Sequence, residues 1–290
     1  MQFDYTSYTY DAENRSMNKY AYVYVPYGYD TCDEKYDVFY VMHGHTGDVT
    51  TFIGDLDDSR DMKNVLDNLI EKGEMKPMLI VFASYYHDNI EADTDNYDVD
   101  LLRSFKYELQ NDLMPQFEST YRTYANSIDE QGLIDSRDHR GFIGFSMGGV
   151  TTWLRLMDSL RYFRYFVPLS GSLYWVGQDI VSQYGMNNPS WTANILIQAI
   201  QAQGYTADDF YILSMTGTED FTHGSLEMQI NDMKQHEEMF HYDETEVNGN
   251  LTYFLAKDEE HDYHAKRLYL FNAFPILSAL IERQSKIAMN

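Results

Sequence analysis

Cysteine is almost absent from this 290-residue sequence, which contains a single one, Cys32. One thiol cannot form an internal disulfide framework, and it excludes a zinc site built from cysteines. Long hydrophobic runs are also missing, because the apolar stretch 79–83 is far shorter than the roughly 20 residues of a membrane-spanning helix. The N-terminal residues MQFDYTSYTY lack the basic start and the apolar stretch of a secretory signal peptide, so we expect none in this chain.

Basic residues are scarce: 21 lysines and arginines face 46 aspartates and glutamates, which gives a formal net charge of -25. Binding to nucleic acid requires a basic face that neutralises phosphates, so the charge argues against a nucleic-acid partner. It argues equally against an anionic membrane. A neutral partner such as a polysaccharide is compatible with the charge, and solubility alone would also explain it.

Internal repeats and proline- or serine-rich linkers are absent as well, and the composition does not break along the chain. With 44% hydrophobic residues, the chain is long enough to bury a sizeable core. We therefore expect residues 1–290 to form a single domain.

What the sequence does contain is an alternation of strand and helix patterns. Short apolar or alternating runs predict strands at 17–25, 36–43, 77–84, 139–146, 162–171, 209–217 and 250–257. Helical spacing of apolar residues predicts helices at 59–72, 100–119, 147–160, 225–240 and 264–284. This order indicates an α/β fold with a mostly parallel central sheet and helices on both faces. Ligands bind such sheets outside the carboxyl ends of the strands.

The segment Gly144-Phe145-Ser146-Met147-Gly148 matches the nucleophile-elbow pattern, Gly-x-Ser-x-Gly. A strand that reverses into a helix in one tight turn exposes the serine hydroxyl, and side chains two residues away on either side would collide. Glycine is therefore required at both positions. The predicted strand before Ser146 and the predicted helix after it are the context that the motif demands.

A nucleophilic serine needs a histidine base and a carboxylate that orients the base. In α/β-hydrolases the acid precedes the histidine in the chain, and both follow the serine. Glu219 and Asp220 come directly after the strand predicted at 209–217, and we prefer Asp220 as the acid. Asp258 and Asp262 remain alternative orienting groups.

Two histidines, His261 and His264, follow the strand predicted at 250–257. We prefer His261 as the base because it lies earlier in the loop, whereas His264 is expected on the first turn of the last helix, exposed to solvent. His87 and His223 lie near strand ends and keep a smaller chance of lining the pocket.

The oxyanion of an acyl-transfer reaction requires two backbone donors. The N–H of Met147, the residue after the serine, is the first candidate, and the N–H of His45 in the early loop His43-Gly44-His45 is the second. An alternative interpretation makes His43, His45 and Asp48 a metal cluster, although their spacing matches no familiar ligand set. The acidic loop 85–100 lacks the third ligand and the glycine of a calcium loop, so we expect a solvated loop.

Five segments together resemble a known family: YVMHGHTGD, ELQNDLMPQFESTYRTYA, DHRGFIGFSMGGVTTW, GTEDF and EEHDYH. They are similar to the esterase-D-like branch of α/β-hydrolases, and within it to the first family of carbohydrate esterases, the feruloyl and acetyl xylan esterases. The resemblance runs from about residue 17 to 284. The base loop EEHDYH departs from the pattern, because the family often has glycines before the histidine.

The resemblance implies the α/β-hydrolase fold and a Ser-His-Asp triad, with no metal and no cofactor. The matching positions are Ser146, His261 and Asp220, and the oxyanion-hole residues are His45 and Met147. The implied substrate is feruloylated or acetylated xylan or its oligosaccharides, cleaved through an acyl-enzyme. The same branch also includes S-formylglutathione hydrolases and siderophore esterases, and the triad does not separate these activities.

In the segment SGSLYWVGQD, Tyr174 and Trp175 would pass near the nucleophile and could stack on a ferulate ring or a sugar face. A tryptophan in a cap or in the core is an equally good interpretation.

We therefore expect a serine carboxylesterase that hydrolyses feruloyl or acetyl esters on plant cell-wall xylan. The first alternative is an intracellular esterase for a small thioester or siderophore ester, and the second is an inactive hydrolase fold that binds carbohydrate. A xylan substrate implies an extracellular location or part of a secreted enzyme, with a cytoplasmic location as the alternative. The sequence leaves the oligomeric state open.

Overall fold

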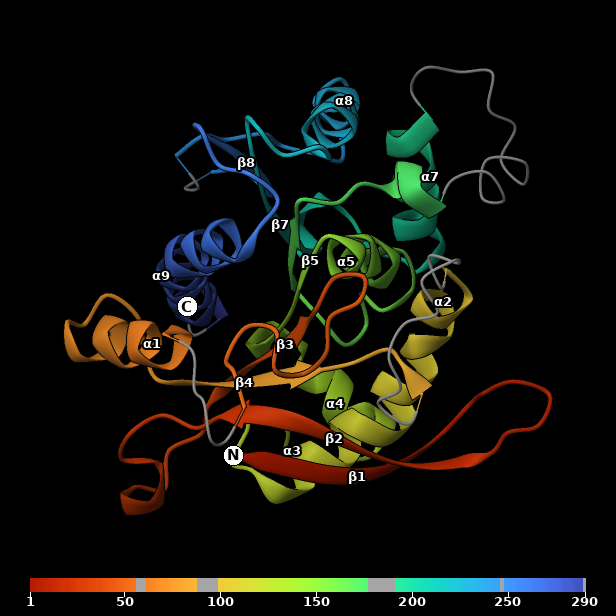
Figure 1. Ribbon diagram of the computed structural model, residues 1–290. Helices are drawn as coiled ribbons and strands as arrows, with labels where there is room; N and C mark the ends of the chain where they lie inside the picture. Colours follow the sequence, from red (N-terminus) through yellow and green to blue (C-terminus); the bar gives the residue numbers. More distant parts are fainter. Residues whose placement is uncertain (56–60, 88–98, 177–190, 246–247, 289–290) are drawn as a thin grey trace.

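Eight strands form one sheet at the centre of the computed structural model, which describes residues 1–55, 61–87, 99–176, 191–245 and 248–288 (Figure 1). Their order across the sheet is β1-β2-β4-β3-β5-β6-β7-β8. The strands are β1 Gln2–Tyr8, β2 Ser16–Tyr24, β3 Asp37–Met42, β4 Met78–Ala83, β5 Arg140–Phe145, β6 Tyr165–Leu169, β7 Tyr211–Gly217 and β8 Leu251–Ala256.

Strands β3 to β8 run parallel to one another, whereas β1 and β2 form an antiparallel hairpin that pairs through β2 with β4. The prediction of a mostly parallel sheet is therefore confirmed. The edge strand β1 was not predicted, although its alternating burial is that of a half-exposed strand.

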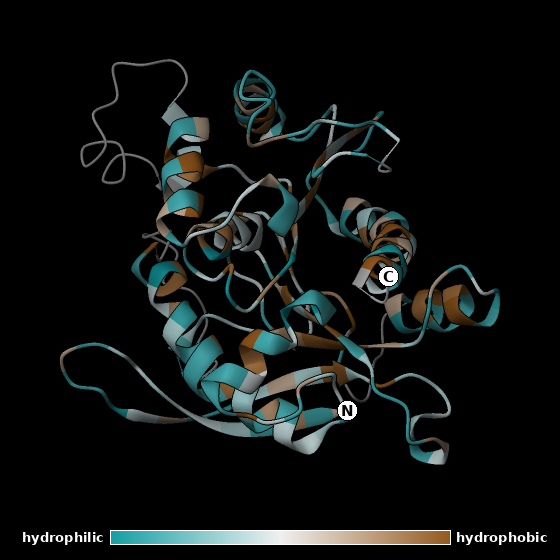
Figure 2. Cartoon of the chain, turned by 180° about the vertical axis from the view of Figure 1, so that it is seen from behind, coloured by the Kyte–Doolittle hydropathy of each residue, from teal (hydrophilic) through white to brown (hydrophobic). Residues whose placement is uncertain are grey.

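The sheet separates two hydrophobic cores. Along β3, Val38, Tyr40 and Met42 face one core, and Phe39 and Val41 face the other. The same alternation holds along β4, because successive side chains of a strand point to opposite faces. Figure 2 shows the hydrophobic residues concentrated in these central strands. Burial on both faces explains why the sequence of β4, and that of β3 after Asp37, is apolar.

Helices cover both faces, as predicted (Figure 1). Helices α1 and α9 contribute to one core, and α2, α3, α4, α5, α7 and α8 contribute to the other. The helices are α1 Met62–Glu71, α2 Val99–Glu108, α3 Met114–Thr120, α4 Glu130–Asp135, α5 Met147–Asp158, α7 Trp191–Ala202, α8 His223–Met233 and α9 Tyr263–Ala288. Short 3-10 turns lie at η1 Tyr29–Thr31, η4 Arg137–His139, η5 Leu173–Val176 and η6 Ala207–Asp209. Helices α4 and α7 were not predicted.

The helix predicted at 100–119 is interrupted by a π-helical segment, Leu109–Leu113 (η3), between α2 and α3. Pro115 explains the interruption: it has no N–H, so the carbonyl of Asn111 loses its α-helical partner and the local winding relaxes. Most of the acidic loop predicted at 85–100, and the end of the segment that begins SGSLYW, lie outside the described residues.

A buried ion pair anchors the start of β5 to α3. The guanidinium of Arg140 donates to both carboxylate oxygens of Glu118, at 2.8 and 2.9 Å, and both side chains are 1% exposed. Arg140 also donates to the carbonyls of Leu133 and Tyr162 and to the hydroxyl of Ser136, so its donors are satisfied inside the protein. The strand that leads to Ser146 thus starts from a fixed point.

The strand order reverses between β3 and β5. The chain passes from β3 to β4 on one side, then crosses back over β3 to continue outwards through β5, β6, β7 and β8. The crevice outside the carboxyl ends of β3 and β5 is therefore the topological switch point, where open α/β sheets bind ligands. Gly44 and Ser146 lie there, each just past the end of its strand. Within the described part of the chain, no helix is both long and apolar enough to span a membrane.

Candidate active site

Ser146 lies between the end of β5 and the start of α5, with φ 59° and ψ -120°. This strained backbone is the conformation that the Gly-x-Ser-x-Gly spacing predicts. A Cβ on Gly144 would lie 2.0 Å from the carbonyl oxygen of Gly148, and a Cβ on Gly148 would lie 2.3 Å from that of Met42. Both glycines are required because the strand and the helix pass each other at contact distance.

The loop after β3 also approaches Ser146 closely. A Cβ on Gly44 would lie 2.9 Å from the Cβ of Ser146, which only glycine avoids. The loop after β6 lies on the other side, where a Cβ on Gly171 would meet the carbonyl oxygen of Ser146 at 2.3 Å. Three strand ends therefore converge on this serine.

Asp220 and His261 are brought together from loops 41 residues apart in the chain. The Nδ1 atom of His261 lies 2.9 and 2.8 Å from the two carboxylate oxygens of Asp220. An ionised carboxylate can only accept hydrogen bonds, so Nδ1 carries the proton and donates it to Asp220. The other ring nitrogen, Nε2, is then the one with a lone pair available to act as a base.

The environment of Asp220 keeps its carboxyl group ionised. Burial alone would raise its pKa, but the hydrogen bonds that it accepts from His261 and from Thr222 lower the pKa below its ordinary value of 3.8. Both the backbone N–H and the hydroxyl of Thr222 donate to Oδ1, each at 2.7 Å. The side chain of Asp220 is 0% exposed in this ion pair.

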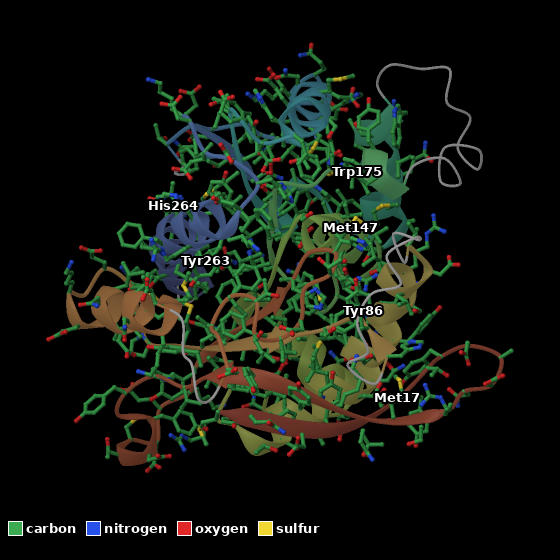
Figure 3. All side chains as sticks on the ribbon, in the orientation of Figure 1. Met17, Tyr86, Met147, Trp175, Tyr263 and His264 are labelled. Carbon is green, nitrogen blue, oxygen red and sulfur yellow. The ribbon has the colours of Figure 1, made fainter. Side chains whose placement is uncertain are left out.

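The alternative acids and bases lie elsewhere. The Glu219 side chain is exposed, and the Asp262 carboxylate accepts from the backbone N–H of Ala265 at the start of α9. Asp258 is exposed too. His264 lies on the first turn of α9 (Figure 3), is 61% exposed and pairs with Glu259. The preference for Asp220 and His261 thus agrees with the geometry.

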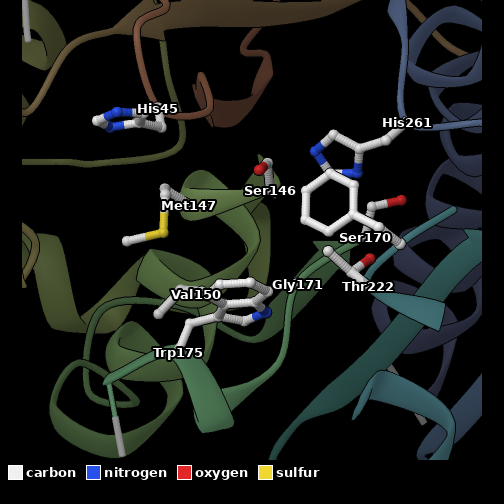
Figure 4. A pocket seen from close by; sticks show the side chains of 10 residues that line it. His45, Ser146, Met147, Val150, Ser170, Gly171, Trp175, Thr222 and His261 are labelled. Carbon is white, nitrogen blue, oxygen red and sulfur yellow. The ribbon is translucent and has the colours of Figure 1, made fainter. Parts of the chain in front are cut away.

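A cavity of about 230 Å³ opens beside Ser146 (Figure 4). Ser146 and His261 both line it, and in Figure 4 the Ser146 side chain lies between those of His45 and His261. The remaining wall is largely carbon: Met147, Val150, Gly171, Trp175, Phe221, Thr222 and Ser170. His87 and His223 are not among the residues that line it. The cavity is suited to an apolar group held next to the serine.

The two aromatic residues predicted to bind substrate have different positions. Trp175 lines the cavity, and its ring meets that of Phe221 edge to face at 6.0 Å. Tyr174 is not part of the described cavity wall; it packs edge to face on Trp191 of α7, at 4.9 Å. Of the two residues, Trp175 alone lines this cavity, and the part that each plays in binding substrate stays a prediction.

Phe221 was not predicted as a site residue. Its ring centre lies 4.3 Å from that of His261, and its side chain is 67% exposed, so it covers the imidazole from the solvent side. The segment GTEDF contains Phe221 directly after Asp220, which is the only signal that could have indicated it. Thr222, the partner of Asp220, follows it in the same loop.

The predicted oxyanion-hole residues, His45 and Met147, also line the cavity. Met147 is the first residue of α5, so its N–H is among those that have no partner within the helix. His45 follows Gly44, where an added Cβ would lie 2.9 Å from the Cβ of Ser146. Both backbone segments border the position where an oxyanion would form.

His43 is buried and unsuited to a metal. Its Nδ1 lies 2.6 Å from the carbonyl oxygen of Gly44, and its Nε2 lies 2.8 Å from the hydroxyl of Ser84. Burial lowers the pKa of His43 to about 4, so the ring is neutral at neutral pH. Both nitrogens are engaged, and among the described residues no group of three potential ligands could hold a metal ion. The alternative cluster of His43, His45 and Asp48 has no geometric support.

Non-glycine residues with positive φ mark this end of the sheet. Thr46 follows β3 at φ 59°, Ser146 follows β5, Ser170 follows β6 at φ 47°, and Asp258 follows β8 at φ 59°. Such conformations are costly for residues with a Cβ and cluster at functional sites. Four of the six non-glycine residues with positive φ in the described part of the chain therefore follow strands at this end of the sheet, and the other two, Tyr10 and Asn14, lie between β1 and β2.

Comparison with known proteins identifies relatives over most of the chain. Residues 14–268 match the model of the family Esterase, described as "Putative esterase". The sequence is 35% identical over 257 residues to endo-1,4-beta-xylanase Y of Acetivibrio thermocellus, an alignment that covers 87% of this chain and 21% of that protein. It is 26% identical over 213 residues to an endo-1,4-beta-xylanase/feruloyl esterase of Xylanibacter ruminicola, covering 69% of this chain and 27% of that protein. The chain thus spans only 21% and 27% of the length of these two relatives.

Solved structures agree with this result. A serine-to-alanine variant of the feruloyl esterase module from Clostridium thermocellum, in complex with sinapinate, is 31% identical and superposes with a TM-score of 0.75, covering 95% of this chain and 87% of that chain. An S-formylglutathione hydrolase from Staphylococcus aureus is 14% identical with a TM-score of 0.55, covering 97% of this chain and 99% of that chain. The second likeness concerns the fold alone.

Proposed function

The chain belongs to the esterase family and is a carboxylic ester hydrolase, and from this premise we propose that it hydrolyses feruloyl or acetyl esters on plant cell-wall xylan. The observation that carries the proposal is the apolar cavity, which is bordered by Ser146 and by His261, the partner of Asp220. The relatives named as xylanases and feruloyl esterases support the choice of substrate.

In the proposed mechanism, Ser146 is the nucleophile and His261 the general base. The Nε2 atom of His261 takes the hydroxyl proton as the Oγ atom of Ser146 forms a bond to the ester carbonyl carbon. Asp220 keeps the imidazole in the required tautomer and stabilises the imidazolium. The N–H groups of His45 and Met147 donate to the oxyanion of the tetrahedral intermediate.

The reaction then proceeds in two stages, collapse of the intermediate to an acyl-enzyme and hydrolysis of the acyl-enzyme. His261 gives its proton to the leaving sugar oxygen, the bond from the carbonyl carbon to that oxygen breaks, and the acyl group stays on Ser146. Water, deprotonated by His261, then attacks the acyl carbon of the acyl-enzyme. The bond from this carbon to Oγ of Ser146 breaks, His261 returns the proton to Oγ, and ferulate or acetate is released. Three side chains, two backbone N–H groups and water account for every step, and no step calls for a metal or a cofactor.

The cavity favours an aromatic acyl group over acetate. Its volume of about 230 Å³ is larger than a methyl group requires, and its wall includes Trp175, Phe221 and Met147. Aromatic rings and a thioether make favourable contacts with a phenolic ring. We therefore rank a feruloyl ester first among the two substrates.

A polymeric substrate also bears on where the protein works. Xylan chains of the plant cell wall lie outside the cell that degrades them, so an enzyme for this polymer acts in the extracellular space. We propose that residues 1–290 form one esterase domain with that location.

The test compares Ser146→Ala with the wild type on methyl ferulate, 4-nitrophenyl acetate and S-formylglutathione. We expect the wild type to hydrolyse methyl ferulate with the highest kcat/KM, and Ser146→Ala to lower its kcat by about 10⁴-fold or more. A fluorophosphonate probe should label the wild type and not the variant. The matched control is Ser119→Ala, which alters an exposed serine on α3. Wild-type turnover by Ser146→Ala, or a preference for S-formylglutathione, would contradict the proposal.

A further inference from the structure

A second cavity, of about 440 Å³, opens on Ser146 next to the first. His45, Ser146 and His261 line both cavities, so the two spaces meet at the reacting atoms. The second cavity is otherwise formed by the loop of residues 44–51 after β3, together with Phe145 and Lys266. Its volume lies within the roughly 300–1,000 Å³ of typical ligand sites.

The two cavities differ in the chemistry of their walls. Met147, Val150, Trp175 and Phe221 present carbon to the first. The second is lined by hydroxyl, carboxylate and ammonium groups, from Thr46, Asp48, Thr50, Thr51 and Lys266. We propose that the second cavity binds the sugar that carries the ester, with Asp48 and Lys266 as its specificity-determining contacts, while the first holds the acyl group. This inference rests on the function proposed above.

The geometry of ester cleavage calls for two such spaces. The carbonyl carbon bears the acyl chain on one side and the alkoxy oxygen on the other, so a bound ester extends in two directions from Ser146. His261 must reach the alkoxy oxygen to protonate it, and it borders the second cavity. An apolar acyl group and a hydroxylated sugar then each lie against a wall of matching polarity.

The loop that forms the second cavity is held in place before any ligand arrives. The N–H of Gly47 donates to the carbonyl of Gly44 at 3.1 Å, and the N–H of Thr46, a residue in the left-handed region, donates to the hydroxyl of Tyr86 at 3.2 Å. A β-branched residue in this conformation is strained, and it keeps the conformation only because contacts with its neighbours hold it there. A fixed loop loses little conformational entropy when a sugar binds.

Asp48 has one oxygen for the loop and one for a ligand. Its Oδ1 accepts from the N–H and the hydroxyl of Thr50, at 2.8 and 2.6 Å. Its Oδ2 has no hydrogen-bond partner among the residues that the structure describes, and the side chain is exposed. A carboxylate oxygen in this position accepts hydrogen bonds from sugar hydroxyls.

Lys266 supplies the complementary donor. Lys266 lies on the first turns of α9, and its ammonium nitrogen is 5.1 Å from the ring centre of Phe145. One cation and one carboxylate in the same cavity suit an uncharged ligand with both donors and acceptors. The cavity therefore matches the hydroxyl groups of a neutral sugar rather than a uronic acid.

The experiment measures kcat/KM on a feruloylated arabinoxylo-oligosaccharide and on methyl ferulate, which has the same acyl group and no sugar. The variants are Lys266→Met and Asp48→Asn, which keep side-chain length and leave an acceptor for Thr50. We expect the ratio of the two kcat/KM values to fall about tenfold in each variant, because a hydrogen bond to a charged group is lost. The ratio cancels any loss of folded enzyme.

Controls and outcomes separate this inference from the proposed function. Lys72→Met and Asp208→Asn remove the same charges from exposed positions outside both cavities and should leave the ratio at its wild-type value. If the wild type hydrolyses methyl ferulate but both cavity variants keep the wild-type ratio within about twofold, the sugar site is overturned and the esterase function stands. If the wild type hydrolyses neither ester, the proposed function fails, and the sugar site fails with it.

Discussion

Asp220 accepts hydrogen bonds from Thr222 at Oδ1 and lies against His261 with both oxygens, and Asp220→Asn tests its role. Thr222 donates twice to Oδ1, so the amide oxygen of the variant must occupy that position. The amide NH2 then takes the position of Oδ2, 2.8 Å from Nδ1 of His261, and favours the opposite tautomer, with the proton on Nε2. This nitrogen can no longer accept the serine proton, and we expect kcat on methyl ferulate to fall about 10⁴-fold.

The control for this prediction is structural. Asparagine has nearly the same volume as aspartate, so the circular dichroism spectrum and the unfolding midpoint of Asp220→Asn should stay close to those of the wild type. A kcat within about tenfold of the wild-type value would show that Asp220 does not determine the tautomer of His261.

His43 is a buried residue whose titration makes the stability of the folded protein depend on pH. Its pKa is about 4 in the folded protein, below the ordinary value of 6.5, because the ring is desolvated. The unfolded chain therefore binds a proton that the folded protein does not, and stability present above pH 6.5 is lost as the pH falls to about 4. The difference corresponds to about 3 kcal/mol of unfolding free energy.

The measurement is chemical denaturation of the wild type and of His43→Gln at pH 7 and pH 5. Glutamine has a donor and an acceptor for Gly44 and Ser84 but does not titrate. We expect the loss of unfolding free energy between these pH values to be smaller in the variant. An equal loss in both proteins would assign the pH dependence to other groups.

At the scale of elements, the contact between α5 and β3 decides whether the nucleophile can be presented at all. A Cβ on Gly148 would lie 2.3 Å from the carbonyl oxygen of Met42 and 2.6 Å from that of His43. These are backbone atoms of a buried strand end and cannot move aside. We expect Gly148→Ala to lower the unfolding free energy by about 1–3 kcal/mol and to displace Ser146, with loss of most of the activity.

Gly224 on α8 provides the matched control. A Cβ there meets nothing within 4 Å, and the residue is helical. Gly224→Ala should raise the unfolding free energy by about 0.4–1 kcal/mol, because it restricts the unfolded chain. Thermal unfolding and methyl ferulate turnover of both variants check the pair. Equal effects of the two substitutions would argue against close packing of α5 on β3 as the cause.

At the scale of the whole molecule, the net charge of -25 is the dominant property. Repulsion among the surface carboxylates destabilises the compact state, and salt screens this repulsion over about 10 Å at 0.1 M. We expect the Tm to rise by roughly 2–4 °C, corresponding to about 1 kcal/mol, when NaCl increases from about 0.01 to 0.15 M. The shift should be smaller near the pI of 4.5, where the net charge approaches zero. If the salt effect on the Tm is equally large at pH 7 and near the pI, charge repulsion is excluded as its origin.

The same charge distribution bears on the substrate. A strongly acidic enzyme repels anionic polymers, whereas a neutral xylan is not subject to that repulsion. The proposed sugar site, with one carboxylate and one ammonium group, agrees with the charge of the whole protein.

The sequence by itself determined the features that depend on short-range sterics and periodicity. Glycine at 144 and 148 can be predicted because a tight strand-to-helix turn allows nothing larger, whatever surrounds it. The largely apolar strands β3, β4 and β5 could be predicted because burial on both faces favours apolar residues, with the charged Asp37 and Arg140 at the first positions of β3 and β5. Parallel strands bring their carboxyl ends to one edge, so the loops of Asp220 and His261 could be expected near Ser146.

Only the tertiary structure decided matters that depend on distances between residues far apart in the chain. It brought Asp220, and not Glu219, into contact with His261, and it placed Trp175 and Phe221, but not Tyr174, in the wall of the apolar cavity. It also divided the space at Ser146 into an apolar and a polar cavity. The physical reason is that side-chain direction within a loop is set by packing against neighbours from other elements, which the local sequence does not specify.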